Sequence, residues 1–158
     1  MMLLRRANLN DYLTYKELYE DAEYRYQWLY YDPIIHDESI EETLDNEFGW
    51  DMVESYKNYT IEKFKKDLKM FQIFMIEEDG QILGSVQTFY CGNGTYKLSE
   101  WGMFQNDYFT KKRVIEEIKT KLPRAKKIHI CTIHSPARNF LISAGFIEIG
   151  GMFLELVV

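Results

Sequence analysis

The stretch MFQIFMIEEDGQILGSVQTFY, residues 70–90, decides the fold of this chain. Its first part, 70–76, is mostly apolar and rich in β-forming residues, which is typical of a central strand covered on both faces. Asp79-Gly80 lies within the turn 78–81 and is the strongest short signal for a hairpin. Residues 82–90 then return as a second strand. We therefore predict a β-hairpin at the centre of the fold.

On the C-terminal side of this hairpin, turn and cap signals separate further elements. Gly92-Asn93-Gly94 predicts a second turn before a strand over 96–104. A helix over 110–122 ends at Pro123, which helix interiors do not tolerate. A strand over 127–133 follows, and then a short helix opened by Ser135-Pro136 and capped by Gly145. The last segment, 146–158, predicts two strands hinged at Gly150-Gly151.

On the N-terminal side, a strand over 3–7 runs into the turn and capping residues 8–11. An apolar stripe at three- and four-residue steps predicts a helix over 12–22. Further helices are predicted over 39–48 and 60–68. The whole order, β-α-α-α-β-β-β-α-β-α-β-β, predicts one α+β domain over residues 1–158. We expect a mixed, mostly antiparallel central sheet with helices on both faces.

Composition excludes several classes of protein. The chain has 158 residues, 46% of them apolar, which suits one domain and argues against disorder. No apolar run approaches the ~18 residues of a membrane span, and the N-terminus lacks a secretory signal pattern. Two cysteines give no disulfide framework, so we expect a reducing cytoplasm. A net charge of −6 disfavours general binding to the phosphates of nucleic acid.

The negative charge is concentrated in one segment. Residues 32–54 contain nine Asp or Glu and no Lys or Arg. One interpretation is a solvated helix face, and the other is an electrostatic funnel that attracts a cationic substrate. Charge alone does not decide between them.

Four segments together resemble the GNAT superfamily of acyl-CoA-dependent N-acyltransferases. They are LRRANLND (4–11), DGQILGSV (79–86), SEWGMF (99–104) and ARNFLISAGF (137–146), which are similar to the family's opening strand and turn, second hairpin, fourth strand and late helix. The resemblance covers nearly the whole chain. It implies a GNAT-like fold and transfer of an acyl group, by preference acetyl, from acyl-CoA to a primary amine of a cationic small molecule or protein.

The family's pyrophosphate loop, Arg/Gln-x-x-Gly-x-Gly/Ala, has no match here. The corresponding segment reads QNDYFTKKR, residues 105–113, without glycine, which argues against the usual pose of acyl-CoA. Lys111, Lys112 and Arg113 are nevertheless expected in the first turn of a helix, where the macrodipole disfavours cations. A bound anion beside Thr110 and these three residues would explain them, and so would side chains that bend into solvent.

The resemblance also implies roles for individual residues. Glu100 matches the position that supplies the general base, and its alternative is an exposed strand carboxylate. Leu141 stands where the family has a tyrosine that acts as general acid. Tyr108 or Tyr90 would have to take over that role, and we name Tyr108 as the candidate. The remaining expected contacts are backbone bonds from Met103 and Phe104 to pantetheine, His134 and Arg138 on the cofactor side, and Asp32, His36 and Asp37 on the acceptor side.

Other interpretations stay open. His129, Cys131 and His134 lack a second ligand cluster at zinc-like spacing, so no metal is predicted. Cys131 is read as a buried thiol rather than a nucleophile, because nothing in the sequence supplies a lowered pKa. The aromatic run 24–31 suits a core or a homodimer contact. The rival function is an inactive GNAT-fold protein that binds a macromolecular partner, and a third is a transferase with another donor, such as a charged tRNA.

Overall fold

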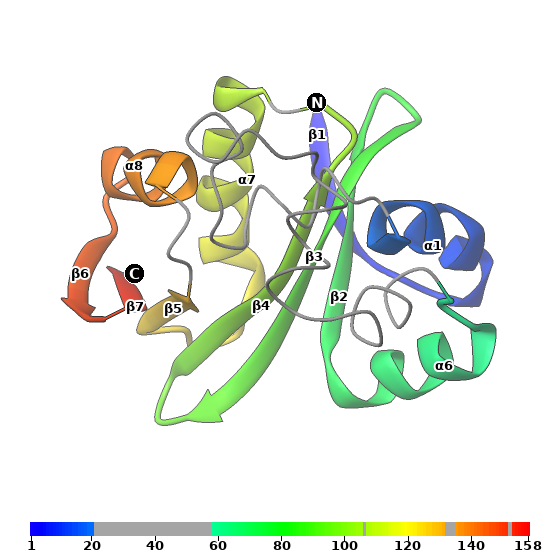
Figure 1. Ribbon diagram of the computed structural model, residues 1–158, viewed down its shortest axis with the longest axis horizontal. Helices are drawn as coiled ribbons and strands as arrows, with labels where there is room; N and C mark the ends of the chain where they lie inside the picture. Colours follow the sequence, from blue (N-terminus) through cyan, green and yellow to red (C-terminus); the bar gives the residue numbers. More distant parts are fainter. Residues whose placement is uncertain (21–57, 106, 132–134, 152) are drawn as a thin grey trace, which may run out of the picture.

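The computed structural model describes residues 1–20, 58–105, 107–131, 135–151 and 153–158. Seven strands of these segments form one sheet in the order β1-β2-β3-β4-β5-β7-β6 (Figure 1). The strands are β1 (Met2–Arg6), β2 (Gln72–Glu78), β3 (Gln81–Gly92), β4 (Thr95–Met103), β5 (Lys127–Cys131), β6 (Ile147–Gly150) and β7 (Phe153–Val157). The helices are a short 3-10 turn (Leu9–Asp11), α1 (Tyr12–Glu20), α6 (Ile61–Met70), α7 (Tyr108–Lys121) and α8 (Ser135–Ser143).

The predicted hairpin is confirmed as β2 and β3 at the centre of the sheet. Asp79 and Gly80 both have positive φ, 52° and 79°, which is the conformation that a two-residue hairpin turn requires. β2 is buried on both faces: Phe74 and Ile76 join one apolar cluster, and Ile73 and Met75 join another. The almost continuous apolar run of β2 follows from this double coverage.

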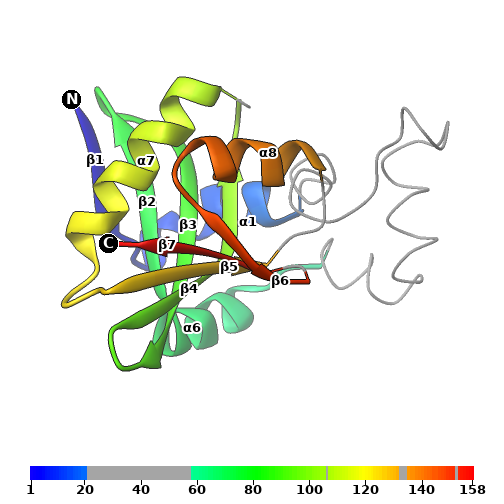
Figure 2. The ribbon, with the colours of Figure 1, turned by 90° about the vertical axis from the view of Figure 1, so that its left-hand side faces the viewer.

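Two helical layers cover the sheet. Figures 1 and 2 show α1 and α6 on one face, and α7 and α8 on the other. Tyr15 and Tyr19 of α1 pack with Tyr59 and Phe64 beneath the first layer. The larger cluster lies beneath α7 and α8 and includes Trp101. The predicted α+β class, with a mostly antiparallel sheet and helices on both faces, is confirmed. Among the strand pairs of the described residues, β4 with β5 is the parallel one.

The boundaries of some elements differ from prediction. α7 begins at Tyr108, two residues before the predicted start, because Asp107 caps it. The predicted helix over 39–48 and the aromatic run 24–31 lie outside the described residues. Within the described part of the chain, no helix is both long and apolar enough to cross a bilayer.

Candidate active site

The centre of the candidate site is an opening between β4 and β5. Their parallel pairing covers only Thr95–Leu98 with Lys127–Ile130, whereas β4 continues to Met103. In its pairing with β3, Leu98 lies opposite Thr88 and Glu100 opposite Gln87, so Ser99 is an extra residue, a β-bulge. A cavity of about 30 Å³, enough for roughly one water molecule, lies at this divergence. Leu98, Ser99, Glu100, Trp101, Ile130 and Cys131 line it.

Backbone groups of β4 face the opening at alternate residues. The N–H of Phe104 donates to the carbonyl of Leu83 in β3 at 2.9 Å. In an antiparallel pair, N–H and C=O groups point to the partner strand at every second residue. Trp101 and Met103 therefore direct theirs toward the diverging β5. The backbone contact expected of Met103 is compatible with this geometry. The one expected of Phe104 is not available through its N–H, which β3 already binds.

Glu100 lies on the face of the sheet that α1 covers. It is half-buried and directly opposite Gln87, and such cross-strand partners share a face. The amide of buried Gln87 donates to the hydroxyl of Tyr15 in α1 at 3.2 Å, and the Ser99 hydroxyl donates to the Gln87 amide oxygen at 2.8 Å. This polar network beside Glu100 was not predicted. Gln87, one of three polar residues in the strand 82–90 with Ser85 and Thr88, was its sequence signal.

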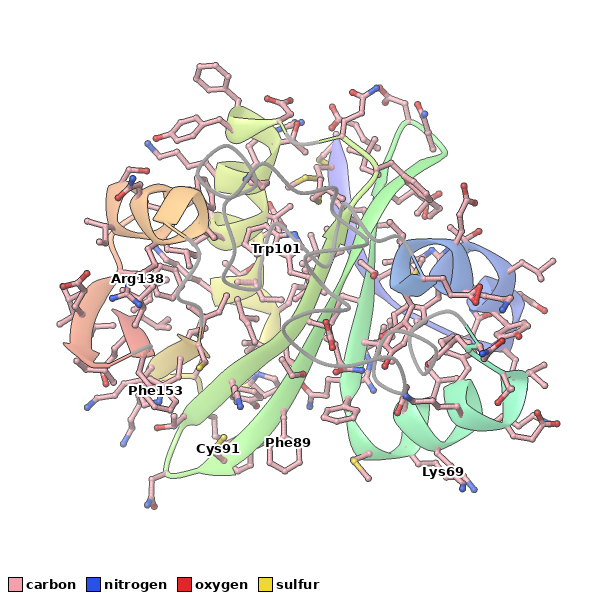
Figure 3. The ribbon with its side chains drawn as sticks, in the orientation of Figure 1. Lys69, Phe89, Cys91, Trp101, Arg138 and Phe153 are labelled. Carbon is pink, nitrogen blue, oxygen red and sulfur yellow. The ribbon has the colours of Figure 1, made fainter. Side chains whose placement is uncertain are left out.

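Trp101 lies on the opposite face, in the layer below α7 and α8 (Figure 3). Its ring meets that of Phe140 in α8 edge-on, with centroids 6.2 Å apart. The indole is 2% exposed, so it forms part of the wall on that side of the opening. Adjacent residues of β4 thus serve opposite faces: Glu100 faces α1, and Trp101 faces α8.

The N-terminus of α7 is occupied by a carboxylate. Asp107 accepts the N–H of Phe109 at 3.1 Å on one oxygen and the hydroxyl of Thr110 at 2.6 Å on the other. The Thr110 hydroxyl, together with the backbone N–H groups, holds the pKa of the Asp107 carboxyl below its ordinary value. The residue is therefore negatively charged at neutral pH, at the helix end where an anionic ligand would otherwise be favoured.

The three consecutive cations of α7 do not converge on one site. Lys111 is 8% exposed, with its Nζ 4.5 Å from the ring centroid of Phe140, and burial lowers its pKa. Arg113 donates to the carboxylate of Glu78 at 2.6 Å. Lys112 lies along a groove of α7 with Met1, Met2, Phe109, Arg113, Glu116 and Glu117. Because α7 starts at Tyr108, these cations begin at its fourth residue, rather than lying in its first turn as predicted.

The other predicted residues are dispersed. The Tyr108 hydroxyl lies 3.2 Å from the Ser143 hydroxyl, at the C-terminal end of α8. Leu141, at the family's tyrosine position, is fully buried in the core. Arg138 binds Glu148 of β6 at 2.9 Å, away from the opening (Figure 3). His134, Asp32, His36 and Asp37 lie outside the described residues.

Two further side chains of β5, those of Cys131 and His129, have separate surroundings. Cys131 is half-buried and lines the small cavity. His129, two residues earlier, lies 2.8 Å from a carboxylate oxygen of Glu155 in β7, through its Nε2. In the described residues, no group of three or more His, Cys, Asp or Glu side chains could hold a metal ion.

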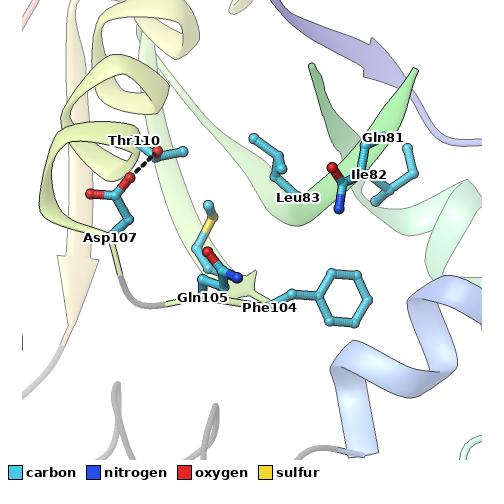
Figure 4. A pocket seen from close by; sticks show the side chains of 8 residues that line it. Gln81, Ile82, Leu83, Phe104, Gln105, Asp107 and Thr110 are labelled. Carbon is cyan, nitrogen blue, oxygen red and sulfur yellow. Dashed lines mark hydrogen bonds between the residues drawn. The ribbon is translucent and has the colours of Figure 1, made fainter. Parts of the chain in front are cut away.

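A larger cavity of about 360 Å³ lies at the head of α7 (Figure 4). Ile82, Leu83, Met103 and Phe104 give it apolar surface, while Gln81, Gln105, Asp107 and Thr110 supply polar groups. Of the described residues that line it, none is a cation and one, Asp107, is an anion. Arg113 and Glu78, which tie α7 to the β2–β3 hairpin, neutralise one another nearby.

The fold is similar to that of several solved acetyltransferases. The PaiA N-acetyltransferase of Thermoplasma acidophilum, in complex with coenzyme A, has a TM-score of 0.68 and 13% identity, covering 100% of this chain and 99% of that chain. A probable acetyltransferase of Staphylococcus epidermidis has a TM-score of 0.65 and 17% identity, covering 100% of this chain and 99% of that chain. The spermidine N-acetyltransferase of Vibrio cholerae, in complex with CoA and spermine, has a TM-score of 0.65 and 12% identity, covering 99% of this chain and 95% of that chain.

At these identities the likeness establishes the fold, and the chain has the GNAT fold that the sequence predicted. No protein-family model matches the sequence, and no curated protein matches it either.

Proposed function

We propose that this GNAT-fold chain is an N-acyltransferase that moves an acyl group, by preference acetyl, from acyl-CoA to a primary amine of a cationic small molecule or protein. The observation that carries the proposal is the opening between β4 and β5, which Glu100 lines and toward which the backbone groups of Met103 point. Two structures of the same fold, the Thermoplasma and Vibrio acetyltransferases, were solved with coenzyme A.

The residues of this chain fit one part of acyl-CoA and not another. The pantetheine arm carries two amides, and the outward backbone groups of Trp101 and Met103 are suited to pair with them along the edge of β4. The diphosphate has no comparable place at the head of α7, because the Asp107 carboxylate holds that position. When bound, acyl-CoA supplies an activated thioester. The chain itself supplies the groove and the acid–base groups.

Glu100 is the proposed general base. An ammonium group must lose a proton before its nitrogen can react, and a carboxylate beside the opening can accept that proton directly or through one water. The network of Tyr15, Gln87 and Ser99 places polar groups on the same face, where an amine would approach. Asp32, His36 and Asp37, in the acidic segment, are proposed to attract the cationic acceptor. Tyr108 stays the proposed proton donor, and its hydroxyl would have to turn away from Ser143 to act.

The variant Glu100→Gln tests this proposal, because it keeps the shape of the side chain and removes the base. With acetyl-CoA and a panel of polyamines and lysine peptides, thiol release should fall by about 10²–10⁴-fold, the usual contribution of a general base. Calorimetric binding of CoA should not change. Glu116→Gln is the matched control, since Glu116 is an exposed carboxylate on the outer side of α7. The proposal fails if millimolar acetyl-CoA gives the wild type neither heat nor a thermal shift.

The alternative is an inactive GNAT-fold protein that binds a macromolecular partner. Two observations favour it: Asp107 blocks the head of α7, and Leu141 is buried where the family places a proton donor. The same experiment separates the two, because this alternative predicts no thiol release with any amine and no difference between wild type and Glu100→Gln.

A further inference from the structure

We infer that this protein holds its acyl donor by the pantetheine arm alone, and that Asp107 is the residue that excludes the donor's phosphates from the head of α7. The inference rests on the proposed function and narrows it. The donor class becomes acyl thioesters of pantetheine, whether or not a nucleotide is attached. Three independent features of the described residues support it.

The first feature is the state of the helix N-terminus. A phosphate binds at such a position by accepting backbone N–H groups and by its attraction to the positive end of the dipole. In α7 the Phe109 N–H and the Thr110 hydroxyl already donate to Asp107, at 3.1 and 2.6 Å. A phosphate would have to displace this carboxylate or lie beside it, and in either case it would meet a like charge.

The second feature is the direction of the nearby cations. Lys111 is turned inward over the ring of Phe140, and Arg113 is paired with Glu78 at 2.6 Å. Lys112 lines the groove beside Met1 and Phe109, which is separate from the cavity at the head of α7. Consecutive helical residues point in directions about 100° apart, and of these three cations none lines the cavity at the head of α7.

The third feature is the chemistry of the cavity that a donor leaving the opening would enter. Met103 lines this cavity and is also the last residue of β4. Figure 4 shows Gln81 and Ile82 on the hairpin side, Gln105 and Phe104 on the side of the β4 end, and Asp107 beyond Gln105. Neutral amides, apolar surface and one carboxylate suit an uncharged polar chain such as pantetheine, and they oppose a polyanion.

Calorimetry with four ligands tests the inference: pantetheine, dephospho-CoA, CoA and adenosine 3′,5′-diphosphate. We expect the dissociation constants of pantetheine, dephospho-CoA and CoA to lie within about threefold of each other. Adenosine 3′,5′-diphosphate should give no heat, because its phosphates gain no favourable charge contact. CoA binding should not weaken between roughly 50 and 500 mM salt, since screening would relieve repulsion by Asp107 and there is no attraction for it to remove.

The decisive variant is Asp107→Asn. Asparagine caps helices as well as aspartate, so the fold should be retained, which a thermal melt verifies. Loss of the carboxylate charge should tighten CoA binding by about threefold or more and leave pantetheine binding unchanged, because only CoA carries the opposing charge. Glu116→Gln removes a charge elsewhere on α7 and should alter neither.

Two different results would overturn the inference, and they are distinguishable. If the nucleotide alone binds, or if CoA binds more than about tenfold tighter than pantetheine with no response to Asp107→Asn, the phosphates are recognised and the inference fails while the proposed transferase stands. If neither pantetheine nor CoA binds to the wild type, the proposed function fails as well. If pantetheine does bind, thioesters of free pantetheine and of protein-bound phosphopantetheine are compared as donors in the thiol-release assay. The better donor shows which source of pantetheine is used.

Discussion

Gly84 is the position where a single methyl group should most disturb the site. It lies in β3 opposite Met103 of β4, at the part of the sheet that borders the opening. A Cβ placed on Gly84 would lie 2.0 Å from the carbonyl oxygen of Gly102 and 2.9 Å from the sulfur of Met103. The sulfur can move, but the carbonyl belongs to the backbone of β4. Gly84→Ala therefore forces the two strands apart or twists them.

The size of the effect follows from this geometry. A carbon and an oxygen that are not bonded need about 3.2 Å, so the backbone has to move by more than about 1 Å in a closely packed sheet. Overpacking in a core costs about 1–3 kcal/mol, and the upper end applies because the opposing atom is backbone. We expect the free energy of unfolding to fall by about 3 kcal/mol, which lowers the urea midpoint by about 1–3 M at ordinary m-values.

Urea unfolding followed by tryptophan fluorescence measures this change, because Trp101 is buried next to the perturbed strand. Gln81→Ala, at the exposed start of the same strand, is the control and should shift the free energy by less than about 0.5 kcal/mol. A Gly84→Ala protein as stable as the control would refute the close approach of β3 and β4. The variant should also bind pantetheine more weakly, since Met103 borders the proposed groove.

Two further predictions concern Asp11 and Tyr108. Asp11 is buried; burial alone would raise its pKa, but Arg5, with two bonds of 2.9 Å, and the Asn8 N–H hold the pKa below its ordinary value. This stabilisation is present above pH ~4 and lost as the pH falls through the lowered pKa. Asp11→Asn should therefore lower the free energy of unfolding, measured by chemical denaturation, by about 2 kcal/mol at pH 7 and by much less at pH 3. An equal loss at both pH values would contradict the charge pairing. Tyr108→Phe should lower kcat, leave KM unchanged and alter stability by under ~1 kcal/mol, and an unchanged kcat would remove Tyr108 as the proton donor.

The elements of the fold were predictable because their signals are local. Asp79-Gly80 fixes a turn by its own backbone preference, and Pro123 and Gly145 end helices within one turn of themselves. Glu100 could be named because it lies at a recognisable place in a strand. The environment of α7 could not be predicted. Lys111 meets Phe140, 29 positions later, and Arg113 meets Glu78, 35 positions earlier. No local pattern encodes those contacts.

The bulge at Ser99 explains how one strand could serve both sides of the proposed reaction. Tyr96 and Leu98 face the core below α7, and regular alternation would place residue 100 on that same face. The extra residue shifts the alternation by one, so that Trp101 and Met103 face the α7 core instead. Glu100 is thereby turned to the α1 face, beside Gln87.

The same bulge coincides with the point where β5 stops pairing with β4, beyond Leu98 and Ile130. A proposed base on one face and a donor groove along the strand edge therefore have a single structural origin. If Ser99 instead paired regularly with Gln87, without a bulge, Glu100 would turn to the apolar core, where an ionised carboxylate is strongly disfavoured. The proposed chemistry therefore requires the bulge, whereas it does not require that residue 99 be serine.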